Sequence, residues 1–261
     1  MIALILALAA GGVVGLALGG LGGGGSMLAV PALIYLLGFD PARATTAGLL
    51  IVAVTSLTGL VTHARAGRVR WRTGTLFAAA GLPAAAAAGA LSARVPGALL
   101  TVTFALLAAV AAWRMLASAA GTASRTGTVQ RAGVDPQAGA ARPDKAAAAG
   151  AGLGAVTGLL GVGGGFLAVP ALVSVLAFPM AEAVGTSLLV ISANSLAALI
   201  PRLSGTGAIT WAVVGPFTGA AVLAAWQGER WAKRLSARTV QKIFAIALLA
   251  VAALMLVDAL R

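Results

Sequence analysis

Apolar residues form long runs along this chain of 261 residues, and short polar segments separate the runs. A helix that crosses a membrane needs about 20 mostly apolar residues at about 1.5 Å rise each. The hydrophobic pattern therefore predicts membrane helices rather than the elements of a soluble domain. The predicted helices cover residues 2–21, 43–62, 74–92, 97–117, 146–160, 182–201, 208–227 and 239–258.

Two further apolar segments, 27–38 and 166–178, each follow a run of glycines. They hold only 12 or 13 residues, too few to cross about 30 Å of hydrocarbon as a helix. We therefore expect each to enter the membrane from one side and to end part-way, as half of a broken or re-entrant helix pair.

The chain contains an internal repeat. Residues 15–33 align with residues 154–172 without a gap, at a constant offset of 139 residues, and the match continues through Ser56 and Ser195. Duplication explains such a match far better than chance. The repeat predicts three parts, which are a first membrane repeat (1–117), a linker rich in small and polar residues (118–145) and a second membrane repeat (146–261).

The basic residues predict the orientation of the two repeats. Loop 63–73 has four arginines, whereas its counterpart 202–207 has only Arg202. Conversely, loop 93–96 has one arginine, and its counterpart 228–238 has four basic residues. Because basic loops stay in the cytoplasm, the repeats are expected to have inverted topology. The same reasoning places the linker inside the cell and both termini outside.

Composition excludes several classes of function. Hydrophobic residues make up 60% of the chain, charged residues 9%, and the mean hydropathy is +1.02, which fits an all-α integral membrane protein. The net charge of +12 lies in loop clusters, so no nucleic-acid partner is expected. The six acidic residues lie at helix ends or in loops, and cysteine is absent. The spans therefore lack the groups that an enzyme, a metal site or a cation carrier would use, and no cofactor is predicted.

The two glycine runs are the first candidate for a binding site. Glycine exposes backbone N–H groups, and the helix start beyond each run offers further donors, which suits a partly dehydrated anion. Irregular backbone at membrane depth is tolerated where it lines a cavity or is buried in protein. The alternative is that the runs only allow two helices to turn tightly. The candidate residues are Gly22, Gly24, Gly25, Ser26, Gly161, Gly163, Gly164 and Gly165.

Polar residues in the third element of each repeat are the second candidate. The expected ligands of an anion are Thr46, Ser56, Thr186, Ser187, Asn194 and Ser195. Hydroxyls in membrane helices often bond back to their own backbone instead, but an amide in hydrocarbon needs another partner. His63 is the only histidine, and it could gate or relay protons at a helix end or be a solvated interface residue.

Glycines four residues apart form a stripe on the first helix of each repeat, and packing against another helix is their expected role. The stripes are Gly11, Gly15 and Gly19 in the first repeat and Gly150, Gly154 and Gly158 in the second. Trp71 and Trp211 start matching helices and are expected to be anchors at the membrane interface.

The doubled glycine pattern ending in Pro31 and Pro170, together with Val184-Gly185-Thr186-Ser187-Leu188 and His63-x-x-x-Gly67-x-Val-x-Trp71, resembles the TauE/SafE sulfite exporter family. The resemblance implies export or uptake of sulfite or related organosulfur anions. The first repeat departs from the family's Gly-Thr-Ser form, because it has Ala44-Thr45-Thr46 there.

The sequence thus predicts a secondary transporter of a small anion, embedded in lipid of the inner membrane with several spans. A non-transporting membrane subunit that assists a partner complex is the alternative. The identity of the anion, the direction of transport, the coupling ion and whether copies form a homo-oligomer stay open.

Overall fold

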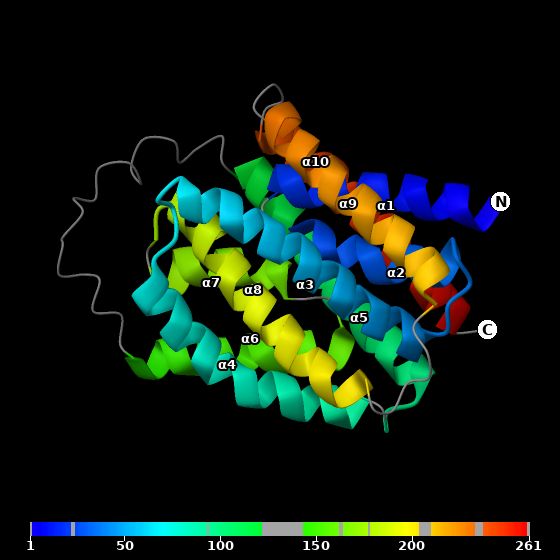
Figure 1. The fold of residues 1–261 in the computed structure, drawn as a ribbon, viewed down its shortest axis with the longest axis horizontal. Helices are drawn as coiled ribbons and strands as arrows, with labels where there is room; N and C mark the ends of the chain where they lie inside the picture. Colours follow the sequence, from blue (N-terminus) through cyan, green and yellow to red (C-terminus); the bar gives the residue numbers. More distant parts are fainter. Residues whose placement is uncertain are drawn as a thin grey trace.

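The computed structural model of the chain describes residues 2–21, 24–92, 94–121, 143–161, 164–176, 178–203, 210–232 and 237–259, and its regular elements there are helices (Figure 1). No strand occurs in this part. The elements are α1 (Ile2–Leu21), the 3-10 helix η1 (Gly24–Leu28), α2 (Ala29–Tyr35), α3 (Pro41–Arg65), α4 (Trp71–Ser92), α5 (Gly97–Gly121), α6 (Pro143–Leu160), α7 (Gly165–Leu176), α8 (Met180–Leu203), α9 (Trp211–Ala232) and α10 (Ala237–Ala259).

Every helix predicted from the hydrophobic pattern is present, with ends displaced by a few residues. Local chemistry sets some of these ends. Asp40 caps α3 by accepting hydrogen bonds from the backbone N–H groups of Ala42 and Arg43, both 3.1 Å long, and Pro41 occupies the first helical position. The prediction of two short segments is confirmed as well, because α2 has 7 residues and α7 has 12. At about 1.5 Å per residue, α7 is only about 18 Å long.

Several helices suit a lipid environment. Among the described residues, three segments are long and apolar enough to cross a membrane, namely Pro41–Arg65, Trp71–Ser92 and Glu182–Arg202. Large apolar side chains are also exposed on many described helices, including Leu76, Trp113, Ile200 and Leu223, each more than 60% exposed. Apolar exposure on this scale is costly in water and ordinary in contact with lipid tails. The fold is therefore that of a helical membrane protein.

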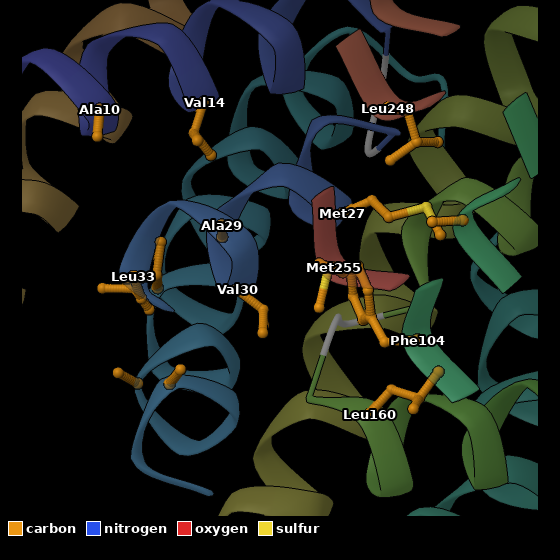
Figure 2. Packing of buried hydrophobic residues seen from close by; sticks show 14 of the residues in the cluster. Ala10, Val14, Met27, Ala29, Val30, Leu33, Phe104, Leu160, Leu248 and Met255 are labelled. Atoms are coloured by element: carbon orange, nitrogen blue, oxygen red, sulfur yellow. The ribbon is translucent and has the colours of Figure 1, made fainter. Parts of the chain in front are cut away.

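Helices from the two halves of the chain are interleaved. The helix pairs with the most extensive packing join α1 with α9, α6 with α4, α4 with α8, α5 with α10 and α3 with α8, and each pair takes one member from each half. In Figure 1, α3 and α8 lie side by side through the middle of the bundle. The largest buried apolar cluster likewise combines α1, η1, α2 and α5 with α10, and Figure 2 shows Met255 next to Phe104 in it.

The predicted role of the glycine stripes in packing is confirmed. A Cβ atom placed on any of the six glycines would lie less than 3.0 Å from a backbone carbonyl oxygen of the facing helix. The contacts repeat in register: Gly11, Gly15 and Gly19 face Phe217, Ala221 and Ala225, while Gly150, Gly154 and Gly158 face Phe77, Gly81 and Ala85. Backbones approach this closely only where side chains are absent, and such approach drives helix association in lipid.

Two ends of the bundle are useful as landmarks. At the Thr45 end, α3 begins, α8 finishes and Gly97 of α5 lies against Pro41. At the Arg70 end, α3 finishes, and α4 and α8 begin, joined by a 3.1 Å hydrogen bond from the Arg70 N–H to Thr186 Oγ1. The start of α1 and the finish of α10 both lie at the Thr45 end (Figure 1).

Candidate functional site

The second glycine run forms a tight turn between α6 and α7. Gly161 and Gly164 have φ angles of +68° and +63°, which residues with side chains rarely adopt. Gly161 is pressed against α3, because a Cβ atom on it would lie less than 3.0 Å from the backbone of Thr45. Gly165 begins α7, and Gly163 lies outside the described residues.

The turn packs against the side of α3, at a level between the two ends of that helix. The 25 residues of α3 give a helix about 37 Å long. The turn contacts Thr45 and Gly48, which are about 6 and 10 Å along α3 from Pro41. Irregular backbone is therefore surrounded by helices at this depth.

The first glycine run lies near the second. Gly24, Gly25 and Ser26 belong to η1, whereas Gly22 is outside the described residues. Ser26 is fully buried, and η1 packs against both α1 and α7. The structure thus brings η1 of the first half against the helix that starts at the second glycine turn.

Buried serines mark the middle of the crossing between α3 and α8. Ser192 Oγ donates a 2.8 Å hydrogen bond to Ser56 Oγ and also contacts the Leu188 carbonyl oxygen at 2.7 Å. The repeat relates Ser56 to Ser195 and Ser192 to Ala53. The equivalent bond to Ser195 would need a donor hydroxyl at the position of Ala53. Ser195 is fully buried, and its Oγ has no hydrogen-bond partner among the described residues.

Asn194 is another buried polar group without a partner in the described part of the chain. Both of its side-chain amide atoms lack a hydrogen bond, although the residue is completely buried. They lie 2.8 Å from the position that a Cβ on Gly81 of α4 would occupy. An unpaired amide in an apolar interior costs about 1–3 kcal/mol, so its retention requires an explanation.

The remaining predicted hydroxyls are satisfied within the protein. Thr46 Oγ1 donates to the Ala42 carbonyl oxygen at 3.0 Å, and Ser187 Oγ donates to that of Val184 at 2.8 Å. Ser56 Oγ contacts the Val52 carbonyl oxygen at 2.6 Å, while Thr186 Oγ1 accepts from the Arg70 N–H. Back-bonding of this kind is the ordinary state of hydroxyls in membrane helices.

A cluster at the Arg70 end ties the two halves together. The Arg70 side chain forms an ion pair with Glu182, and its guanidinium lies 4.7 Å from the centre of the Phe178 ring. His63 lies at the same end, with its Cβ 3.4 Å from the position of a Cβ on Gly185. Its Nδ1 is 3.0 Å from the Gly59 carbonyl oxygen, one turn back in α3. His63 is thus placed between α3 and the start of α8.

Comparison with known proteins agrees with the resemblance noted in the sequence. The family model described as "Sulfite exporter TauE/SafE" matches residues 7–255. The chain belongs to the TauE/SafE sulfite exporter family. It is 32% identical over 252 residues to a "Probable membrane transporter protein" of Xylella fastidiosa strain Temecula1, and 31% identical to one of strain 9a5c. Each match covers 95% of this chain and 93% of the relative. No solved structure matches the chain significantly.

Membership of the TauE/SafE family makes the chain a membrane transport protein. In this TauE/SafE protein, no group of three or more His, Cys, Asp or Glu side chains that could hold a metal ion is found among the described residues. The buried polar groups that the structure describes on α3, α6 and α8 are hydroxyls, the Asn194 amide and the guanidinium of Arg202.

Sequence reasoning missed three of these polar residues. It counted Arg202 as a loop residue, but Arg202 lies in α8 and is 2% exposed. Its Nη1 donates to Thr45 Oγ1 at 2.8 Å, and its Nη2 donates to the carbonyl oxygens of Gly158 and Leu159 in α6, the latter at 3.0 Å. The other two are Ser192 and Thr157. The spacing of Ser192 three residues before Ser195, on one helix face, was the available signal for the former.

Proposed function

We propose that this TauE/SafE protein is a secondary transporter that carries a small anion of the sulfite or sulfonate type across the inner membrane. The observation that carries the proposal is the pair of buried, unpartnered groups on α8, the Asn194 amide and the Ser195 hydroxyl. Such groups are costly unless a ligand completes their hydrogen bonds. In a transporter, the natural ligand is the solute that is carried.

The chemistry of the bundle centre favours an anion. N–H and O–H donors stabilise a partly dehydrated anion through hydrogen bonds. A cation would need carboxylates at the centre of the bundle. The structure describes the side chains of two acidic residues, Asp40 and Glu182, and both lie at helix ends. Sulfite-type anions are proposed on the strength of the family description.

The conformation described here is closed. A pocket beside the second glycine turn is lined by Thr45, Leu160 and residues of α2, α5 and α10, and its volume is about 10 Å³. This is room for about one water molecule. Passage of an anion therefore requires these helices to separate, as alternating access in transporters does.

Packing directions support the inverted arrangement of the two repeats. Along each glycine stripe, the residue numbers of the glycines and of the residues that they face rise together. Helix α1 therefore runs parallel to α9, and α6 runs parallel to α4. The first repeat begins at the Thr45 end, whereas α6 begins at the Arg70 end, beside the start of α4. Trp71 and Trp211, both more than 50% exposed, begin helices at opposite ends as well. Basic loop 63–73 would then face the cytoplasm together with the linker.

Topology reporters test this arrangement directly. A reporter fused at residue 130 is expected to score in the cytoplasm, and one fused after residue 261 is expected to score outside, because the halves are inverted. Alkaline phosphatase and green fluorescent protein activities of matched fusions give the measurement. Reporters on the same side would contradict the inverted repeat and leave anion transport itself untouched.

The Asn194→Leu variant tests the binding site. Leucine has nearly the shape of asparagine, so it removes an unsatisfied amide at little steric cost. We expect an unchanged or higher melting temperature in detergent, together with a loss of at least about tenfold in sulfite uptake by proteoliposomes.

The matched control is Ser187→Ala, which removes a hydroxyl that already bonds to its own helix and should change uptake by less than about twofold. Full uptake by the Asn194→Leu protein would show that the amide does not bind the anion. Absence of uptake of sulfite, sulfonates and sulfate by the wild-type protein would instead favour a subunit that assists a partner complex.

A further inference from the structure

The second glycine turn lies between two helix ends of opposite polarity. At Leu160, α6 presents the carbonyl groups of its last turn, and at Gly165, α7 presents the N–H groups of its first turn. A helix terminus carries about half an elementary charge, negative at the carboxyl end and positive at the amino end. Left alone, the end of α6 would offset the attraction of α7 for an anion.

Arg202 changes this balance. Its guanidinium donates hydrogen bonds to the carbonyl oxygens of Gly158 and Leu159, which belong to the last turn of α6. The side chain is almost completely buried, so water screens its charge little. A full positive charge placed on a helix end of about half a negative charge makes the neighbourhood of the turn positive.

Thr157 adds a hydrogen-bond donor beside the same turn. It is fully buried on α6, and its Oγ1 has no hydrogen-bond partner among the described residues. This oxygen lies less than 3.0 Å from the position of a Cβ on Gly164, the residue that directly precedes α7. The hydroxyl is therefore aimed at the amino terminus of a 12-residue helix.

The first repeat lacks both groups at the corresponding positions. At the repeat offset of 139 residues, Thr157 corresponds to Leu18, and Arg202 corresponds to His63 when α3 and α8 are kept in register. Leu18 belongs to the buried apolar cluster. The Nδ1 atom of His63 contacts the carbonyl oxygen of Gly59 in its own helix. The glycine runs are therefore common to both repeats, whereas the hydroxyl and the buried guanidinium occur at these positions only in the second repeat.

We propose that the anion site is single and asymmetric. It is the turn between α6 and α7, where the N–H groups at the start of α7 and the Thr157 hydroxyl bind a small oxyanion and the charge of Arg202 selects for it. This inference rests on the proposed function and assigns its charge selectivity to the second repeat. Asn194 and Ser195 lie about two turns before Arg202 on α8, where they bind the same anion as it passes, and the first glycine run has a structural role.

The closed conformation fits this assignment. Thr157 Oγ1 fills the space beside Gly164 in this conformation. The pocket of about 10 Å³ is lined by Leu160, the last residue of α6, and by Thr45, which accepts a hydrogen bond from Arg202. An oxyanion enters when the turn moves away from α3, and the hydroxyl then turns from Gly164 to the ligand. Thr45 of α3 accepts a hydrogen bond from Arg202, so the charge stays on the α3 side of the opening during this step.

The test compares concentration-dependent uptake of sulfite and of methanesulfonate into proteoliposomes. Arg202→Gln removes the charge and should raise the KM for both anions at least about tenfold. Arg202→Lys keeps a point charge and should raise the KM much less. Thr157→Val keeps the shape, loses the hydroxyl and should raise the KM about three- to tenfold.

Matched controls separate charge selection from general effects. Arg43→Gln removes an exposed charge at the Thr45 end, and Thr58→Val removes a hydroxyl bonded to its own helix, so both should leave the KM within about twofold. Equal increases in KM for Arg202→Gln and Arg202→Lys would overturn selection of the anion by charge. A wild-type KM for Thr157→Val would overturn the proposed position of the site. Should Arg202→Gln fail to fold, Thr157→Val decides alone. A wild-type protein inactive with every anion would instead refute the proposed function.

Discussion

Replacement of Gly154 by valine is expected to prevent assembly of the folded bundle. The new Cβ would lie less than 3.0 Å from three backbone atoms of Gly81, and backbone cannot move aside as a flexible side chain can. Either α6 separates from α4 or both helices distort, at a cost of about 3 kcal/mol or more. Thermal unfolding in detergent and the monodisperse fraction after size exclusion measure the effect.

The same helix offers a matched control two residues away. Gly152 is exposed, and a Cβ placed on it would meet no atom within 4 Å. Gly152→Val should therefore keep the melting temperature within a few degrees of the wild-type value, because helix propensity alone changes by less than about 1 kcal/mol. Equal melting temperatures for the two variants would show that the close approach of α6 to α4 is absent in the protein.

Substitution of Gly161 by alanine is expected to abolish anion uptake and to lower stability. Its φ of +68° costs a residue with a side chain about 1–2 kcal/mol, and its Cβ would in addition meet the backbone of Thr45. The turn would have to move away from α3, and with it the start of α7. Sulfite uptake and thermal unfolding of the purified protein provide the measurement.

Gly67→Ala isolates the backbone component of this effect. Gly67 has the same φ of +68° but no atom within 4 Å of a Cβ, so only the backbone strain of about 1–2 kcal/mol should appear. We expect Gly67→Ala to transport at close to the wild-type rate after reconstitution. If Gly161→Ala matched it in both assays, close packing of the turn against α3 would have no part in transport.

Much of the architecture could be predicted from the pattern of residues. Helix positions followed from apolar runs because hydrocarbon tolerates few other sequences, and the shortness of α7 followed from a count of its residues. The packing role of the glycine stripes was also predictable, since residues four apart share a helix face. Their partners were not, because the helix that covers a stripe lies in the other half of the chain.

The candidate site was predicted less completely. Asn194 was singled out correctly as a buried amide, because its polarity is conspicuous in an apolar run. Arg202 was assigned to a loop, since an arginine at the end of an apolar run ordinarily reaches water. Its burial depends on the last carbonyl groups of α6, more than 40 residues away in the chain.

The sequence by itself determined that this protein is a duplicated, helical membrane protein with two glycine runs and a centre free of acidic groups. These properties depend on composition, period and spacing, which act locally along the chain. Only the tertiary structure decided which buried polar groups have partners. Ser56 and Ser195 are equivalent in the repeat, yet one meets Ser192 and the other meets no hydroxyl, because hydrogen bonding is set by the facing helix and not by the residue itself.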